Sequence, residues 1–159
     1  MQRAKFGKKS LIKEKILNEK NNSGEITYYN EEVYSGGFKH GKKEGHGKYY
    51  YNNGDRYEGD FKNDVREGKG IYYFSDGDKY EGDWKNGKKE GKGVYYCNDG
   101  RRYEGKWKND EPFGPGKLYN NNNIVEEVNY FEPINNQVIN QNNLEQDHPH
   151  NNNNMYIAF

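Results

Sequence analysis

Few residues of this sequence have the type and spacing that enzyme chemistry requires. Acidic side chains do recur at fixed intervals, at Glu58, Asp60, Glu81, Asp83 and Glu104. Two such carboxylates could in principle act as a general acid and base. They alternate with glycine and aromatic residues at every second position, which is typical of the solvent-facing side of a β-strand. We therefore predict that they form a solvated polar face and not a catalytic pair.

The other reactive side chains are also better explained without catalysis. Cys97, the only cysteine, occupies the position that Tyr51 and Phe74 occupy in neighbouring segments, so packing accounts for it. His148 and His150 could bind a metal ion weakly, but two histidines in an asparagine-rich stretch are better explained as incidental. The sequence contains no glycine-rich phosphate loop followed by a lysine. We predict a protein that is not an enzyme and needs neither metal nor cofactor.

Length and composition narrow the fold class. The chain has 159 residues, of which only 30% are hydrophobic, against roughly 45–50% in an average globular chain. Aromatic residues make up 16% and include 16 tyrosines, so a conventional aliphatic core is excluded. Mean hydropathy is −1.47, and no stretch approaches the ~18 apolar residues of a membrane span. These values favour a thin β-structure that packs through aromatic rings.

Charge and targeting signals add an expectation about partners and location. Lysine and arginine number 25 and are balanced by 25 acidic residues, so no net basic field would attract nucleic acid. The first residues lack the apolar segment of a secretory signal, and a single cysteine cannot form an internal disulfide. We expect a cytoplasmic protein, associated with cytoskeleton or membrane, that does not bind nucleic acid.

A 23-residue period organises the middle of the chain. The units are 34–56, 57–79, 80–102 and a divergent fourth, 103–123. Eight aromatic positions keep this period, and we call them the eight repeat rings: Tyr34, Phe38, Tyr57, Phe61, Tyr80, Trp84, Tyr103 and Trp107. Glycine keeps it at Gly36, Gly45, Gly47, Gly59, Gly68, Gly70, Gly82, Gly91, Gly93, Gly105, Gly114 and Gly116. Such a period indicates an array in which each unit packs on its neighbours.

Each unit reads as a β-hairpin. In the third unit, residues 80–85 alternate ring, charge and glycine, which places both rings and the glycine on one face of a strand. A turn over 85–90 and a second strand over 91–97 follow. The unit then ends in Asp99-Gly100, a dipeptide that favours the positive φ of a tight turn.

The repeated glycines have a structural role in this prediction. Glycine normally weakens a strand, but an aromatic ring on one strand can lie flat over a glycine on its neighbour and shield the backbone. Ring-over-glycine contacts would then replace an aliphatic core. We predict an all-β fold, an elongated and twisted antiparallel β-meander built of 23-residue hairpins.

The segments on either side of the repeats are expected to cap the array. Residues 1–33 are predicted to contain a short basic amphipathic helix, followed by a degenerate half-repeat strand near Gly24 to Tyr28. The apolar face of that helix would consist of Leu11, Ile12, Ile16 and Leu17. Within 124–159, residues 124–131 could continue the meander as a last strand, and the Asn-rich tail that follows is predicted to be disordered.

The repeat motif resembles the MORN (membrane occupation and recognition nexus) family. Units such as YEGDWKNGKKEGKGVYYCNDG match its pattern of Tyr-x-Gly-x-Trp/Phe, a glycine turn and Gly-x-Gly, over about residues 34–119. Two departures are Asp64 in the second unit and Asp110 in the fourth, at the turn position where the first and third units have Gly41 and Gly87. The fourth unit also contains prolines. Its hairpin is therefore expected to be irregular and to lie at the edge of the array.

The resemblance implies a non-catalytic scaffold. Family members link membranes to the cytoskeleton, build ciliary or cortical structures, and hold partner helices or peptides in an aromatic groove. The eight repeat rings are therefore the candidate partner groove, with coverage by the chain's own flanks as the alternative. Similar repeats accompany phosphoinositide kinases, so a kinase name could be transferred to a chain that carries only the accessory repeats.

Binding of anionic phospholipid is the second function that the sequence allows. Basic residues gather near the N-terminus and in the turns within each unit, and the candidate lipid contacts are Lys8, Lys9, Lys13, Lys42, Lys43, Lys88 and Lys89. Acidic residues in the same turns would cancel part of the attraction. A capping role of the N-terminal segment competes with membrane anchoring.

Overall fold

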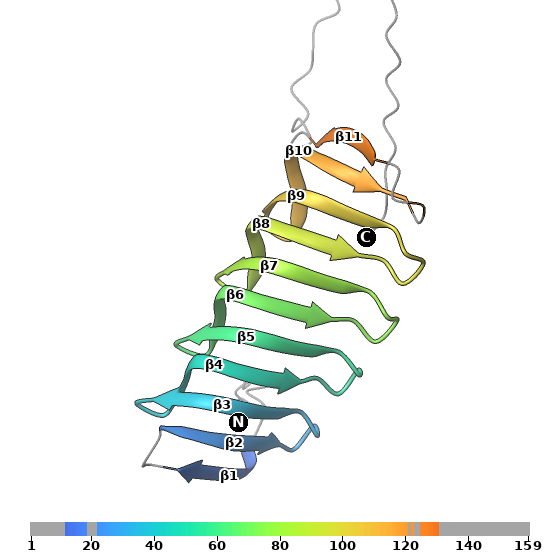
Figure 1. Ribbon diagram of the computed structural model, residues 1–159. Helices are drawn as coiled ribbons and strands as arrows, with labels where there is room; N and C mark the ends of the chain where they lie inside the picture. The colour runs from blue at the N-terminus through green and yellow to red at the C-terminus, as the bar shows by residue number, and fades with distance from the viewer. Residues whose placement is uncertain (1–11, 19–21, 121, 123–124, 131–159) are drawn as a thin grey trace, which may run out of the picture.

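The structure is a computed structural model, and it describes residues 12–18, 22–120, 122 and 125–130. These residues form one antiparallel sheet in which the eleven strands follow each other in chain order (Figure 1). The strands are β1 (Ile12–Asn18), β2 (Ser23–Tyr28), β3 (Val33–Lys39), β4 (Lys42–Tyr50), β5 (Arg56–Lys62), β6 (Val65–Tyr73), β7 (Lys79–Lys85), β8 (Lys88–Tyr96), β9 (Arg102–Lys108), β10 (Glu111–Tyr119) and β11 (Val125–Tyr130). The predicted all-β meander is confirmed.

The predicted N-terminal helix is wrong for the part of it that the structure describes. Residues 12–18 form strand β1, which pairs with β2 through Leu17 opposite Gly24 and Ile16 opposite Glu25. Residues four apart share a face in a helix and in a strand, so the spacing of Ile12 and Ile16 fits both. The unpaired backbone of β2 decides between them, because a strand satisfies it and a helix does not. Leu11 lies outside the described residues.

The two additional strands predicted beyond the repeats are present. β2 pairs with β3 on the N-terminal side, and β11 pairs with β10 on the C-terminal side. β10 is therefore not at the edge of the sheet, although it contains Pro112 and Pro115. Its register against β9 shifts between Phe113 and Gly116, so Pro115 lies in an irregularity where the ladder to β9 is interrupted. The predicted disordered tail lies outside the described residues.

The turn inside each unit is shorter than predicted. Lys88 to Glu90 belong to β8, and only two residues, Asn86 and Gly87, join β7 to β8, with φ of 52° and 80°. Two consecutive positive φ values are typical of a type I′ hairpin. Asp110 replaces the glycine in the fourth unit and takes the same conformation, with φ of 76°. The hairpin of the fourth unit therefore forms without glycine at this position.

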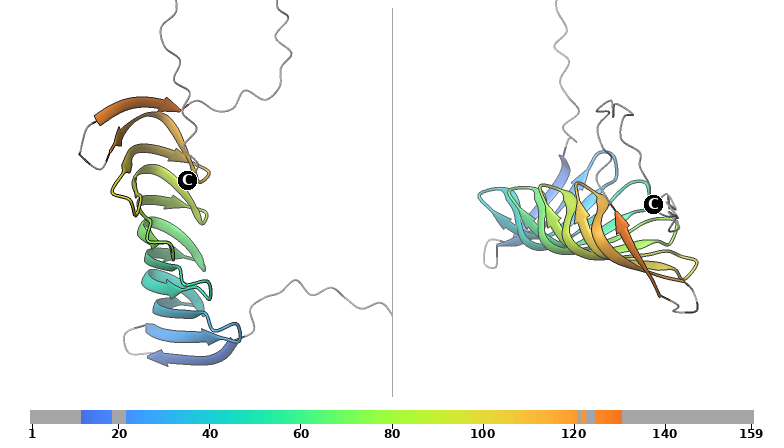
Figure 2. Two further views of the ribbon diagram at one scale, coloured as in Figure 1. Left: turned by 90° about the vertical axis from the view of Figure 1, so that its right-hand side faces the viewer. Right: turned by 90° about the horizontal axis from the view of Figure 1, so that it is seen from above.

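A bulge bends the hairpin of each of the four repeats at the same place. The register of β7 against β8 shifts between Gly82 and Trp84, opposite Gly91, whose φ is 71°. A glycine with positive φ at such a position makes a bulge that increases the local bend and twist. The same shift occurs between β3 and β4 and between β5 and β6. The strands are accordingly bowed, and the sheet is twisted rather than flat (Figure 2).

The ring-over-glycine contact exists and is very close. Gly82 and Gly93 pair across β7 and β8, and the Tyr80 side chain lies over both. A Cβ built on Gly93 would lie 2.4 Å from the Tyr80 hydroxyl oxygen and 2.6 Å from its ring carbons. The Tyr80 hydroxyl donates a hydrogen bond to the Asp83 carbonyl at 3.0 Å, which orients the ring along its own strand. Only glycine leaves room for this ring at Gly93.

The rings stack into two continuous ladders on this aromatic face. In the first ladder each repeat tyrosine contacts two aromatic rings edge-on, which are Phe or Trp rings except for Tyr130 beside Tyr103. Tyr80, for example, lies 5.3 Å from Trp84 and 5.1 Å from Trp107, between ring centroids. The second ladder runs beside it through tilted pairs, of which Tyr72 with Phe74 at 4.7 Å is one. Edge-to-face pairs at these distances stabilise beyond their buried area, so the ladders serve as the core.

Replacing Gly93 with alanine should destabilise the protein. The Gly93→Ala methyl group meets a Tyr80 ring that is fully buried and cannot move aside. Overpacking of this kind costs about 1–3 kcal/mol of unfolding free energy, which urea denaturation followed by circular dichroism would measure. Gly87→Asp is the matched control, because Asp110 takes the same positive φ in the fourth unit. An equal loss in both variants would contradict the steric explanation.

The buried phenols predict loss of stability in alkali. Burial, and then the nearby Tyr130 phenol, raise the pKa of Tyr103 to about 12, and burial also raises the pKa of Tyr34, Tyr57 and Tyr80. A tyrosine in the unfolded chain ionises near pH 10. The unfolded state therefore loses protons first, and the unfolding free energy should fall as the pH rises above about 10. The buried tyrosines should ionise only as the circular dichroism of the fold is lost, so a tyrosine absorbance change that is complete before unfolding would contradict this burial.

Candidate protein-binding surfaces

The eight repeat rings, predicted to line a partner groove, are buried within the array itself. Their exposed fractions lie between 0% and 7%. Tyr34, Tyr57, Tyr80 and Tyr103 are fully enclosed by glycine backbone and by Phe or Trp rings. The chain thus covers these rings with its own strands. A partner on this face would meet the atoms that lie above the rings.

Cations cover the aromatic face. The Lys89 ammonium group lies 4.3 Å from the centroid of the Trp107 ring, and the Arg66 guanidinium lies 4.4 Å from that of Trp84. Lys43 occupies the equivalent place, 4.6 Å from the Tyr49 ring. Burial lowers the pKa of Lys43 and of Lys89. These two candidate lipid contacts are therefore half-buried and engaged in cation–π contacts.

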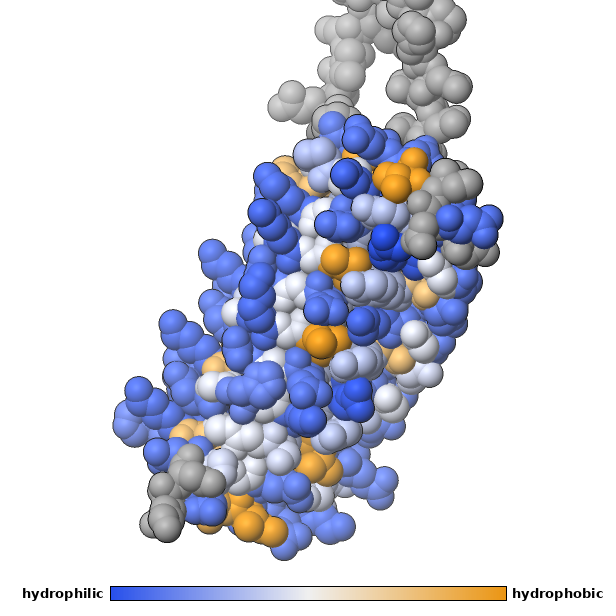
Figure 3. Space-filling view, viewed as in Figure 1, coloured by the Kyte–Doolittle hydropathy of each residue, from blue (hydrophilic) through white to orange (hydrophobic). Residues whose placement is uncertain are grey.

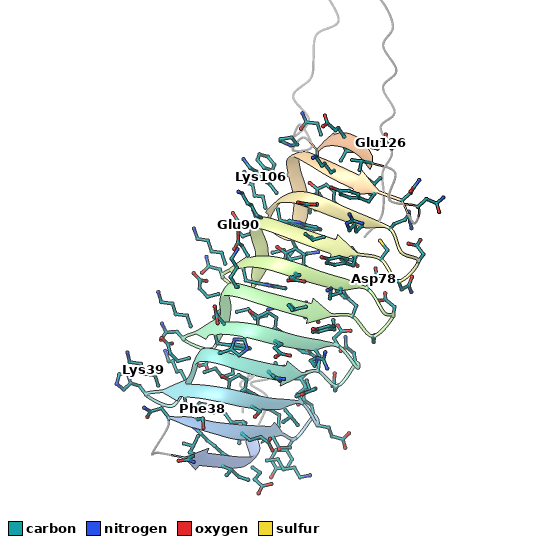
Figure 4. The ribbon with its side chains drawn as sticks, in the orientation of Figure 1. Phe38, Lys39, Asp78, Glu90, Lys106 and Glu126 are labelled. Atoms are coloured by element: carbon teal, nitrogen blue, oxygen red, sulfur yellow. The ribbon has the colours of Figure 1, made fainter. Side chains whose placement is uncertain are left out.

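The hairpin tips form one long edge of the sheet and are bonded to each other. Glu67 accepts a hydrogen bond from the backbone N–H of Asn86 at 2.9 Å, and Asp110 accepts one from that of Lys89 at 2.8 Å. Both bonds join neighbouring repeats. Figure 4 shows Lys39, Glu90 and Lys106 toward this side of the molecule and Asp78 on the opposite side.

Exposed lysines project from the same tips. They include the candidate lipid contacts Lys42 and Lys88, and the exposed set is Lys39, Lys42, Lys62, Lys85, Lys88 and Lys108. Lys13 is exposed on β1. Lys8 and Lys9 lie outside the described residues. The tips therefore present a row of amines beside the carboxylates that join the repeats.

Buried tyrosine hydroxyls bind aspartates at the other edge. Tyr95 donates to Asp78 at 2.7 Å, and the backbone N–H of Asn98 donates to the same carboxylate at 2.9 Å. Asp55 accepts equivalent bonds from Tyr72 and Ser75. Burial alone would raise the pKa of Asp55, but these hydrogen bonds outweigh burial and lower it. The repeated aspartates thus connect one hairpin to the next, a role that the sequence analysis did not assign.

The opposite face of the sheet, the charged face, carries a row of tyrosines and cations. Neighbouring strands place Arg56 opposite Tyr73, Lys79 opposite Tyr96, and Arg102 opposite Tyr119. The cation-to-ring distances are 4.1, 4.1 and 3.7 Å. We call this the tyrosine–cation row, and it comprises Tyr50, Arg56, Tyr73, Lys79, Tyr96, Arg102 and Tyr119. The sequence analysis did not single it out, although the 23-residue spacing of its tyrosines was a usable signal.

An open groove of about 1190 Å³ runs beside this row on the charged face. It extends from His46 on β4 to Asn129 on β11. The lining combines the repeated glycine backbone with charged and small apolar side chains, among them Glu58, Ile71, Glu81, Lys92, Val94 and Tyr96. Four of the five carboxylates predicted to be solvated therefore border the groove: Glu58, Asp60, Glu81 and Glu104. Figure 3 shows one side of the molecule, where hydrophobic residues lie singly in a largely hydrophilic surface.

The structure also describes the surroundings of Cys97 and of possible metal ligands. Cys97 packs against the aromatic core, and burial raises the pKa of its thiol. Within the described residues, no three His, Cys, Asp or Glu side chains are grouped so that they could hold a metal ion. Nor does this part of the chain contain a helix of the length and apolarity that crossing a membrane requires.

The comparison with family models decides the identity of the repeats. The model described as MORN repeat matches residues 34–56, 57–79, 80–101 and 103–124. The chain belongs to the MORN-repeat family. This confirms the resemblance that the tyrosine and glycine period indicated. MORN repeats are generally non-catalytic and serve as repeat scaffolds.

Comparisons with individual proteins differ between sequences and structures. No curated protein sequence matches this MORN-repeat chain. Among solved structures it is similar to the SAS-4 (dCPAP) TCP domain of Drosophila melanogaster, solved in complex with a Proline Rich Motif of Ana2 (dSTIL). That likeness has 15% sequence identity and a TM-score of 0.43, and it covers 71% of this chain and 75% of the other.

Removing one of the bridging aspartates should weaken the MORN array. Asp78→Ala takes an acceptor from the half-buried Tyr95 hydroxyl and from the Asn98 N–H, which should lower the unfolding free energy by about 1–3 kcal/mol. Tyr95→Phe introduced into Asp78→Ala should cost little more, because the hydroxyl has already lost this acceptor. Fully additive losses in a double-mutant cycle would contradict the bond.

Proposed function

We propose that this protein is a non-catalytic MORN-repeat scaffold that binds an elongated protein segment along its charged face. The observation that carries the proposal is the open groove that crosses eight strands, β4 to β11. Neighbouring strands lie about 4.8 Å apart, so the groove is about 34 Å long. An elongated helix or peptide suits such a groove better than a small molecule, which prefers an enclosed pocket.

The two faces of the sheet are not equally available. The aromatic face is filled by its own rings and by Lys43, Arg66 and Lys89. In the described part of the chain, no second layer covers the charged face. We therefore place the predicted helix or peptide partner on the charged face and not on the aromatic face. A link between cytoskeleton, ciliary or cortical structure and membrane stays a prediction.

The chemistry of the groove favours specific recognition over strong general adhesion. Both signs of charge occur along its walls, because Glu58 and Lys69 line it and pair with Lys48 and Asp83 next to it. Ile71 and Val94 add small apolar contacts between them. Mixed charge steers and registers a partner more than it adds raw affinity. The partner segment therefore needs no net charge of its own.

Anionic phospholipid is the second candidate ligand, and the exposed tip lysines support it. Each basic residue at an anionic membrane surface contributes about 1 kcal/mol. Glu44, Glu67 and Glu90 lie at the same tips and offset part of this attraction. The membrane contact would be at the edge of the sheet, away from the groove, so one molecule could hold both ligands.

Variants on the two surfaces separate these functions. Val94→Asp with Lys92→Glu changes the groove, and Lys85→Glu with Lys88→Glu changes the tips. Calorimetry with a purified partner should show a loss of about tenfold or more in affinity for the groove variant and an unchanged affinity for the tip variant. Normal circular dichroism would show that both variants fold.

Vesicle flotation supplies the complementary measurement. The vesicles contain phosphatidylcholine with phosphatidylserine or phosphoinositide. The tip variant should bind them more weakly than the unmodified protein, and the groove variant should bind them equally well. Binding should weaken with added salt. If partner binding depends on the tips and ignores the groove variant, the charged-face proposal is wrong.

A further inference from the structure

The tyrosine–cation row has the geometry of a binding site for one kind of peptide. We propose that it binds a proline-rich segment in the polyproline II conformation, lying across the strands. This inference rests on the proposed charged-face scaffold and names the class of partner. Four observations support it: free hydroxyls, a repeat distance, ring surfaces that cations flank, and a balanced charge.

Two tyrosines of the row keep their hydroxyl groups available, whereas the Tyr119 hydroxyl donates to Glu104 at 3.4 Å. Tyr72 and Tyr95 on the aromatic face donate to Asp55 and Asp78. Among the described residues, the hydroxyls of Tyr73 and Tyr96 on the charged face have no hydrogen-bond partner. Neighbouring residues on the same strands thus differ, one hydroxyl used in the fold and the next one free. A polyproline II backbone has no internal hydrogen bonds, so its carbonyls can accept from such donors.

The spacing of these hydroxyls matches that peptide conformation. Successive tyrosines of the row are two strands apart, which is about 9.6 Å. Three residues of polyproline II rise about 9.3 Å and return to the same side of the helix. From Tyr50 to Tyr119 the row covers three such intervals, about 28.8 Å, against about 27.9 Å for nine peptide residues.

Other peptide conformations fit this spacing less well. Seven residues of an α-helix, the shortest repeat near this distance that returns to one face, rise about 10.5 Å, and three intervals accumulate a mismatch of about 2.7 Å. An extended strand advances about 9.9 Å in three residues, but its third side chain points to the opposite face. Of these three conformations, only polyproline II matches the spacing of the tyrosines and returns every third side chain to the same face of the peptide.

The row also provides suitable apolar surfaces. Three of its four rings, those of Tyr73, Tyr96 and Tyr119, have a cation at 3.7 to 4.1 Å from the ring centroid. Lysine and arginine also have apolar hydrocarbon stems that can pack against a ligand. Tyrosines and cations alternate along the row from strand to strand, so rings recur at the spacing of every third peptide residue. Aromatic surfaces of this kind are what proline-rich peptides dock onto.

Charge in the row is balanced, so the ligand needs no net charge. Each cation has an acidic residue two positions further along its own strand, as Lys79 has in Glu81, with which it pairs at 3.3 Å. Arg56 is followed in the same way by Glu58, and Arg102 by Glu104. Binding should therefore depend on hydrogen bonds and ring contacts, and it should vary little with salt.

The test uses a fluorescein-labelled dodecaproline peptide and the full chain. Fluorescence anisotropy should show binding that is unchanged within about twofold between about 50 and about 500 mM NaCl. Tyr73→Phe with Tyr96→Phe keeps both rings and removes the hydroxyls, and it should weaken binding about fivefold or more. Tyr29→Phe, at an exposed tyrosine outside the row, is the matched control and should leave binding unchanged.

Three outcomes would overturn the inference. They are no binding of dodecaproline, equal losses in the row and control variants, or a preference for an amphipathic helical peptide that the row variant weakens. The last outcome would still support the charged-face scaffold. If neither the row variant nor the groove variant changed the affinity for a purified partner, the scaffold proposal would be wrong as well.

Discussion

The fold depends on one contact, a tyrosine ring that lies flat over a pair of glycines on adjacent strands. Tyr80 over Gly82 and Gly93 is the example in the third unit, and a Cβ on Gly93 would fall within 2.6 Å of the ring. A sheet with few aliphatic residues has no other way to shield its backbone on that face. Once the tyrosine is placed, Trp84 and Trp107 pack against its edges, and the ladder continues into both neighbouring units.

Polar bonds at the two edges complete what the rings begin. Glu67 and Asp110 join hairpin tips on one side, and Asp55 and Asp78 hold tyrosine hydroxyls on the other. Each of these bonds joins one repeat to the next, so a unit is stabilised by its neighbours rather than by itself. The result is an elongated object with two very different faces.

That division of faces determines where a partner can bind. The eight repeat rings, which the sequence suggested as a peptide groove, are buried in the packing of the array, and cations lie over them. The charged face keeps an open groove and a row of tyrosines, two of whose hydroxyls have no partner within the described residues. In the proposed scaffold, one face is thus the core of the array and the other is left for recognition.

The repeat, the hairpins and the ring-over-glycine contact could all be predicted from the amino-acid sequence, because each depends on residues a few positions apart in a motif that occurs four times. The N-terminal segment could not, since the spacing of Ile12 and Ile16 fits helix and strand alike and the free edge of β2 decides. The burial of the eight repeat rings could not be predicted either, because it depends on how closely neighbouring units approach. The tyrosine–cation row required the cross-strand register, because Arg56 and Tyr73 are brought together only by pairing across a bulged hairpin. Local pattern therefore specified the unit, while packing between units specified which surface is left to bind.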